Sequence, residues 1–216
     1  MPQIFHPSMN TISRVTIFGA VFMLALATWL VLAIVRSPYV TNAEVILEQP
    51  VPFSHKHHVA DAGIDCRYCH TSVEAGPFAG IPPTQTCMNC HSQLWADSPM
   101  LAPVRASFAN DLPLVWNRVY DLPDYAYFDH SIHVRKGVAC ATCHGDVANM
   151  PLTWRSATLH MEWCLQCHRD PGPNVGPREL VAAAFQPPPV GDARNPEEWI
   201  KEYHIQSKTN CSVCHR

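Results

Sequence analysis

Charged side chains are scarce in this sequence, and so are the signatures of an enzyme that turns over a substrate unaided. Asp, Glu, Lys and Arg make up 15% of the 216 residues, and the formal net charge is -3. The chain therefore offers no basic face for binding nucleic acid. It also contains no glycine-rich nucleotide loop and no recognisable nucleophile or acid–base pair.

Long stretches of regular hydrophobic periodicity are lacking as well. The 20 prolines and several aperiodic segments are poor material for a core of packed helices or sheets. A chain of this length normally builds such a core. The apolar interior must therefore come from something other than regular secondary structure.

No cysteine remains for a disulfide or a free thiol, because all ten fall into five Cys-x-x-Cys-His motifs. The motif cysteines are Cys66, Cys69, Cys87, Cys90, Cys140, Cys143, Cys164, Cys167, Cys211 and Cys214, and the motif histidines are His70, His91, His144, His168 and His215. Two thiols at this spacing add across the vinyl groups of haem, and the adjacent imidazole becomes the proximal iron ligand.

A single motif could instead be half a zinc site or a thioredoxin-like redox pair. However, five Cys-Cys-His triplets do not divide naturally into four-ligand zinc sites, and a dithiol redox motif needs no trailing histidine. The sequence therefore predicts five covalently bound haems c.

Five porphyrins would supply the missing apolar interior. We expect a small, mainly irregular α-type multihaem cytochrome c domain, with short helices packed on the haems. The expected helices span residues 53–59, 86–95, 97–111, 156–169, 179–185 and 196–205, with Asp97 or Ser98 capping the third and Asn195 capping the last. Residues 112–123 are expected to form a short strand or an extended segment.

One N-terminal segment is long and apolar enough to span a membrane. Residues 15–35 are 21 consecutive residues without a charge. A cleaved signal peptide is the competing interpretation, and Ala25-Leu26-Ala27 provides a possible cleavage site. The apolar run continues past it to Val35, which favours a retained transmembrane helix.

The sequence thus predicts a lead at residues 1–14, an anchor at 15–36, a connector at 37–52 and a haem domain at 53–216. Within this domain we expect a haem pair at 53–95, an insertion at 96–126 and a haem trio at 127–216. Arg14 and Arg36 flank the anchor evenly and do not decide its orientation. Thioether attachment takes place outside the cytoplasm, so we expect a cytoplasmic lead and a periplasmic haem domain on the inner membrane.

Two histidine pairs precede haem motifs at the same spacing and are the best candidates for distal iron ligands. His55 and His58 lie ahead of Cys66, and His130 and His133 lie ahead of Cys140. We expect the first histidine of each pair to serve the haem just downstream and the second to reach another iron. His57 is interpreted as a polar or propionate-binding residue, and His6 precedes the anchor.

The fifth iron has several possible partners. They are His160, His204, Met161, Met150 or no protein ligand at all. Met161 is favoured, because a thioether is a natural axial ligand and raises the haem potential relative to a second imidazole.

The single anchor, the blocks FSHKHH and FDHSIH, and the five haem motifs, with LHMEWCLQCHR as the fourth, together resemble the pentahaem cytochrome c subunit of alternative complex III. The resemblance covers nearly the whole chain and implies Met161 as the fifth distal ligand. It implies a role in a membrane complex that oxidises quinol and reduces a periplasmic cytochrome c, a copper protein or an attached oxidase. It further implies three kinds of partner: an iron–sulfur subunit related to molybdopterin oxidoreductases, polytopic membrane subunits and a monohaem cytochrome c.

Two other classes remain as alternatives. A tetrahaem membrane-anchored quinol dehydrogenase also has one N-terminal span, but usually carries a methionine shortly after its first motif, where this chain has Thr71 to Gly76. A catalytic multihaem reductase would need an iron with an open face. The available histidines and methionine make an open face unnecessary.

Overall fold

The computed structural model describes residues 4–183 and 195–215. The chain divides into two compact units, Met1–Asn42 and Ala43–Arg216.

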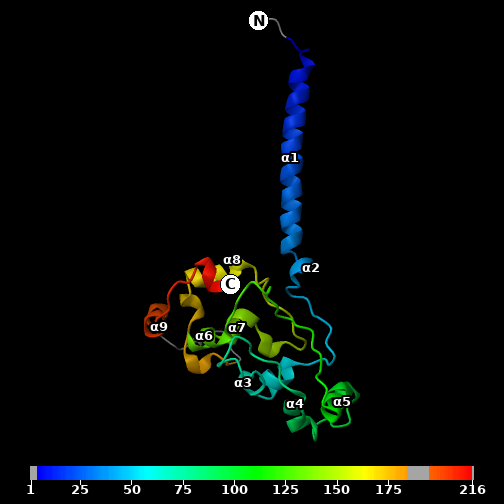
Figure 1. The fold of residues 1–216 in the computed structure, drawn as a ribbon, viewed down its shortest axis with the longest axis vertical. Helices are drawn as coiled ribbons and strands as arrows, with labels where there is room; N and C mark the ends of the chain where they lie inside the picture. Colours follow the sequence, from blue (N-terminus) through cyan, green and yellow to red (C-terminus); the bar gives the residue numbers. More distant parts are fainter. Residues whose placement is uncertain (1–3, 184–194, 216) are drawn as a thin grey trace. The chain divides into compact units, whose positions relative to one another are not determined.

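The first unit is dominated by the 29-residue helix α1, Ser8–Arg36, which is followed by the short helix α2, Pro38–Thr41 (Figure 1). A rise of 1.5 Å per residue makes α1 about 44 Å long. None of its residues is buried within the structure, and its mean hydropathy reaches 2.5. The helix is therefore long and apolar enough to cross a membrane, and it contains the whole segment predicted as an anchor.

The second unit consists of short helices joined by irregular segments (Figure 1). Its helices are η1 Lys56–Asp61, α3 Cys66–Cys69, α4 Thr84–His91, η2 Pro99–Leu101, α5 Ala102–Asn110, α6 His130–Arg135, α7 Cys140–His144, η3 Val147–Asn149, α8 Met161–Arg169, η4 Gly172–Asn174, η5 Arg178–Leu180, α9 Pro196–Glu202 and α10 Cys211–Cys214. The described residues contain isolated β-bridges but no strand. The predicted fold class is confirmed.

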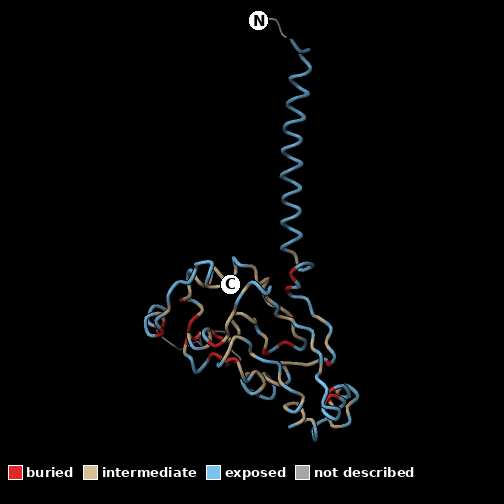
Figure 2. Tube along the Cα trace, viewed as in Figure 1, coloured by how far each residue is buried: buried red, intermediate tan, exposed pale blue. Residues whose placement is uncertain are grey.

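The protein core of this unit is sparse. Figure 2 shows buried residues in short, separated stretches, and no described side chain is less than 2% exposed. One small apolar cluster joins Val175, Trp199 and Tyr203, with Val138 and Ile205 packed against it. A chain with so little apolar packing of its own depends on other apolar groups for its interior.

Several predicted helices begin or end elsewhere. The helix expected at 156–169 begins at Met161, because Leu159 adopts a left-handed φ of 58°, which interrupts a right-handed helix. The helix expected at 86–95 is α4, which ends at His91; beyond it, Trp95 has a φ of 54°.

The turn expected at 53–59 is the π-helix η1, in which the N–H of Ala62 bonds to the carbonyl of His57. The helix expected at 97–111 is divided into η2 and α5, and Ser98 lies at the N-cap of η2.

Residues 112–123 form no strand; the segment is irregular and bends at Val119 and Tyr120. Asn195 caps α9 through its side chain as predicted, although α9 ends at Glu202. The turns expected at 179–185 begin as η5, and residues 184 and 185 lie outside the described part of the chain.

Candidate haem-binding sites

Each Cys-x-x-Cys-His motif folds as a short helical turn. In the first and last motifs, the histidine N–H bonds to the carbonyl of the first cysteine, His70 to Cys66 and His215 to Cys211, both at 2.9 Å. Residues at i, i+3 and i+4 of a helix share one face. Both thiols and the imidazole of a motif are therefore presented on one side, as attachment to a single haem requires. All ten thiols are free of disulfides.

Four motif histidines have their rings oriented by backbone carbonyls, to which Nδ1 donates. The bonds run from His70 to Gly80 at 2.7 Å, from His91 to Leu94 at 3.0 Å, from His168 to Lys208 at 2.9 Å and from His215 to Tyr125 at 3.1 Å. A proton fixed on Nδ1 leaves Nε2 free to bind a metal and makes the imidazole a more basic ligand. This arrangement suits a proximal haem ligand.

The two upstream histidine pairs lie in the same local structure. Phe53 stacks on His58 at 4.5 Å and meets His55 edge-on at 5.0 Å; Phe128 stacks on His133 at 4.5 Å and meets His130 edge-on at 4.8 Å. The repeated pattern is thus Phe-x-His-x-x-His. The sequence analysis did not single out the phenylalanine of this pattern, although its position two residues before each first histidine is a readable signal.

The Nδ1 atoms of these four histidines are also engaged. His58 donates to the carbonyl of Ser54 and His133 to that of Asp129, both at 2.7 Å. His130 donates to the carbonyl of Pro77 at 2.6 Å, and His55 shares a hydrogen bond of 2.9 Å with the Thr153 hydroxyl. In His58, His130 and His133 the proton therefore lies on Nδ1, which leaves Nε2 unprotonated, as a metal ligand requires.

Three of these rings face motif histidines. The ring centres of His130 and His144 are 6.4 Å apart, those of His58 and His91 6.1 Å, and those of His133 and His168 6.1 Å. A metal–nitrogen bond of about 2 Å, with the ring centre about 1 Å farther out, places two imidazoles on opposite faces of one iron about 6 Å apart. The three pairs fit this separation.

His55 lies near His70. Burial lowers the pKa of His55 to about 4, with further lowering by His70 and then by His58. The pKa of His144 is likewise lowered to about 4, mainly by burial. Electrostatic repulsion from His130, His70 and His55 lowers it further. Both imidazoles are thus kept neutral at physiological pH, the form that binds a metal.

No ring of another histidine contacts His215 among the described residues; the nearby ring is that of Tyr125, at 5.9 Å. Met161 opens α8 and is 61% exposed, whereas Met150 is 2% exposed. His160 is the N-cap of α8 and lies 4.0 Å from Glu162, and His204 is exposed.

His57 is turned away from the motif histidines. It is exposed, and its Nδ1 lies 3.1 Å from Asp61 Oδ2. This placement agrees with its interpretation as a polar residue.

Neighbouring motifs touch in an order that differs from their order in the chain. Tyr68, inside the first motif, accepts a hydrogen bond of 3.1 Å from Asn89, inside the second. The thiol of Cys66 contacts that of Cys140, which joins the first motif to the third.

The third and fourth motifs are neighbours as well. The pKa of Cys143, in the third motif, is raised to about 12. Burial is the main cause, and the nearby thiols of Cys167 and Cys164, in the fourth motif, add to it. The pKa of Cys164 is raised by burial and, second, by the nearby thiol of Cys214. The fourth motif is therefore a neighbour of the fifth. The spatial order is therefore second, first, third, fourth, fifth.

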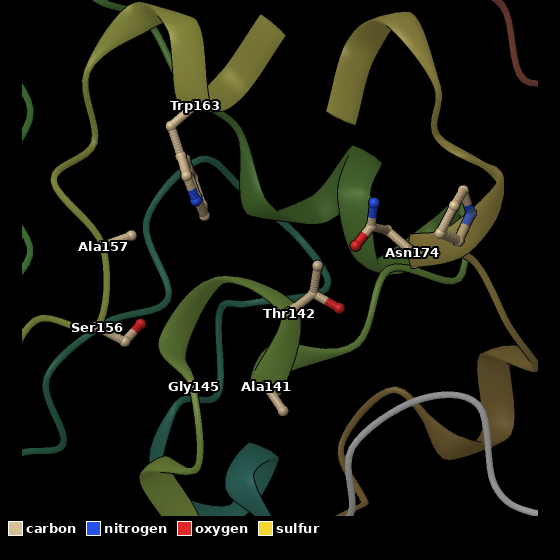
Figure 3. Close-up of a pocket in the computed structure, with 8 residues that line it drawn as sticks. Ala141, Thr142, Gly145, Ser156, Ala157, Trp163 and Asn174 are labelled. Atoms are coloured by element: carbon tan, nitrogen blue, oxygen red, sulfur yellow. The ribbon is translucent and has the colours of Figure 1, made fainter. Parts of the chain in front are cut away.

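A cavity of about 330 Å³ lies between the third and fourth motifs (Figure 3). Thr142 of α7 and Trp163 of α8 line it, together with Gly145, Ser156 and Asn174. Figure 3 shows the Trp163 side chain projecting from α8 toward α7. The Thr142 hydroxyl is buried and has no protein partner among the described residues.

Comparison with known proteins yields one informative similarity. No protein-family model matches the sequence. The multihaem cytochrome c subunit of menaquinone reductase from Nitratidesulfovibrio vulgaris (strain Hildenborough) is 35% identical to this chain over 142 residues, which cover 56% of this chain and 68% of that protein.

Proposed function

From the premise that the chain belongs to the family of multihaem cytochromes c that contains this menaquinone reductase subunit, we propose that it is a membrane-anchored pentahaem cytochrome. It relays electrons inside a quinol-linked membrane complex. In the proposed assignment, the ten motif cysteines carry five haems c and the five motif histidines are proximal ligands.

The observation that carries this proposal is the pairing of histidine rings along a continuous series of motifs. His55, His58, His130 and His133 would be the distal ligands of the first, second, third and fourth irons, in that order. This assignment rests on the ring separations of about 6 Å for three pairs and on the proximity of His55 to His70. Met161 would complete the fifth iron, since its helix carries Cys164, the neighbour of Cys214.

The haems supply the one-electron chemistry, and the protein supplies their ligands and spacing. With two protein ligands on each iron, no face remains open to a substrate. The chain itself is therefore proposed to relay electrons without turning over a substrate, and catalysis belongs to the complex.

We propose that this complex is alternative complex III, with α1 in the inner membrane and the haem unit in the periplasm. The partners would be an iron–sulfur subunit related to molybdopterin oxidoreductases, polytopic membrane subunits and a monohaem cytochrome c. A soluble cytochrome c or a copper protein would take the electrons. The resemblance of the histidine blocks and of LHMEWCLQCHR supports this assignment.

A second candidate function reverses the direction of electron flow. The similar protein is named as part of a menaquinone reductase, so the haem chain of this family also serves a complex named for reducing quinone. In that case electrons would enter from a periplasmic donor and leave toward the membrane.

The test uses the intact complex purified through this chain in detergent. Menaquinol added anaerobically is expected to reduce the haems, and oxidised cytochrome c added afterwards should reoxidise them. The isolated chain should oxidise quinol far more slowly than the complex. If quinol fails to reduce the haems while a reduced periplasmic donor drives menaquinone reduction, the second direction is the correct one.

A further inference from the structure

The irregular segment at residues 112–123 contacts the third motif. Tyr120, near its end, places its ring 4.3 Å from the ring of His144, at an interplanar angle of 56°. This is the shortest ring separation found at any motif histidine among the described residues.

The Tyr120 hydroxyl is held by the backbone that carries the third motif. It accepts a hydrogen bond of 2.8 Å from the N–H of Ser156 and donates one of 2.9 Å to the Ser156 hydroxyl, and its oxygen lies 3.4 Å from the carbonyl oxygen of Cys143. The Ser156 hydroxyl donates to the same carbonyl at 2.9 Å. The tyrosine is thus tied through Ser156 to the residue that precedes His144.

Gly145 allows this close packing. Its φ is +63°, and a Cβ added there would lie 2.8 Å from the Cβ of Ser156. On the other side, Arg155 donates through Nε to the carbonyl of Val119 at 3.0 Å, which fixes the backbone next to Tyr120. The ring position is therefore set from both directions.

His144 also differs from the other motif histidines in how its ring is oriented. Within residues 4–183 and 195–215 its Nδ1 has no hydrogen-bond partner, whereas the other four donate to carbonyls. Its ring plane lies 14° from that of His130, while the His58–His91 and His133–His168 pairs are inclined by 69° and 54°.

We propose that Tyr120 is a positioning residue that holds the His144 imidazole nearly parallel to that of His130 and so gives the third haem a ligand field unlike those of the second and fourth. The inference rests on the proposed ligation of this haem by His130 and His144. Parallel imidazole planes overlap with the same iron d orbital and split it from its partner, whereas steeply inclined planes leave the two orbitals nearly equal in energy. A ferric haem of the first kind gives a rhombic low-spin electron paramagnetic resonance signal, and one of the second kind gives a strongly axial signal.

The experiment uses the full haem-loaded chain in detergent, with paramagnetic resonance spectra of the oxidised protein and a spectroscopic redox titration. The wild type should show a rhombic bis-imidazole signal, which His130→Ala should abolish. Tyr120→Leu should move that signal toward the axial form and shift one midpoint potential. The signals of the second and fourth haems should keep their positions.

Two milder variants separate the ring from its anchor. Tyr120→Phe keeps the ring and loses its hydrogen bonds, and Ser156→Ala keeps the tyrosine and loses one of its partners. Both should shift the same signal in the same direction by less than Tyr120→Leu does. Tyr39→Leu serves as the control, because Tyr39 is 89% exposed and belongs to the other unit, so it should change no signal.

A Tyr120→Leu protein with its full haem content, an unchanged rhombic signal and unchanged potentials would refute the positioning role and leave the proposed relay intact. A wild type that lacks five low-spin haems would instead contradict the proposed ligation. If Tyr120→Leu loses haem during maturation, the Phe and Ser156→Ala variants decide, and unshifted spectra in both overturn the inference.

Discussion

Adjacent histidines in the first histidine block have opposite environments. His58 stacks on Phe53 and faces His91, whereas His57 is exposed and paired with Asp61. We predict that His58→Ala removes the distal ligand of the haem at the second motif. That haem, one of five, should become high-spin and bind carbon monoxide when reduced. Optical and resonance Raman spectra of the purified chain provide the measurement.

The matched control is His57→Ala, which should leave all haems low-spin. A high-spin signal in the His57 variant, with none in the His58 variant, would mean that the two roles are exchanged.

Met161 is the first residue of α8, and His160 is its N-cap, with an extended backbone at a ψ of 153°. One distal position remains on the fifth iron, so only one of the two can fill it. Met161→His should lower one midpoint potential and keep the full haem content, because an imidazole stabilises ferric iron more than a thioether does. His160→Ala should leave every potential in place; a new high-spin haem in this variant alone would assign the ligand to His160.

For individual residues, the sequence identified the haem-attachment motifs but not the backbone atoms that orient their histidines. The Cys-x-x-Cys-His spacing is readable because the chemistry of attachment demands it. The acceptors of His168 and His215 are the carbonyls of Lys208 and Tyr125, 40 and 90 residues away along the chain. Because any residue can supply a backbone carbonyl, no pattern of side chains predicts these partners.

The turn between α6 and α7 depends on Gly137. Its φ is +75°, and a Cβ there would collide with the carbonyl oxygen of Gly176 and lie 2.8 Å from Tyr203 Cε2. Gly137→Ala should therefore destabilise the haem unit by about 2 kcal/mol or more, through left-handed backbone strain together with displacement of the backbone at Gly176.

Gly63→Ala is the matched control for this change. Gly63 has a φ of +70° but nothing within 4 Å of its added Cβ, so only the strain of about 1 kcal/mol should appear. Thermal unfolding of the two haem-loaded variants gives the comparison. Equal losses of stability would show that the contact with Gly176 is unimportant.

Element boundaries were predicted well where a local cap decides them and poorly where a distant contact does. Asn195 begins α9 because its side chain accepts from the N–H of Glu197. The helix at 156–169 looked continuous in the sequence, but Leu159 adopts a φ of 58°, and Ser156, which lies outside the helix, contacts Tyr120, 36 residues away. A pattern read along the chain contains neither this turn nor this contact.

The two compact units separate at Asn42 and Ala43, which predicts that the haem unit folds without α1. Replacing residues 1–42 by a cleavable secretion signal should give a water-soluble protein with five haems. Intact mass and pyridine-haemochrome absorbance measure the haem content of both forms. Full haem loading of the whole chain, together with an aggregated or haem-poor truncated form, would contradict the prediction.

The spatial order of the motifs could not be predicted from their order in the chain. It depends on contacts such as Asn89 with Tyr68 and Cys66 with Cys140, which carry no signature in either motif. The repeated histidine blocks did predict that second histidines reach across to other motifs, and the structure places His58 against His91 and His133 against His168. The blocks did not say which motifs these would be, and the ligation of iron by these rings stays a prediction.

The reach of these second histidines also bears on how the protein is made. In the proposed ligation, every distal ligand precedes its own motif in the chain: His55 and His58 come before Cys66 and Cys87, His130 and His133 before Cys140 and Cys164, and Met161 before Cys211. In the proposed topology the haem unit is translocated starting from the end next to α1, so the sixth ligand would already lie outside the membrane whenever a new attachment motif appears. Each iron could then be closed on both faces in turn, so that a nascent chain need never expose a reactive, half-coordinated haem while it waits for residues still to be secreted.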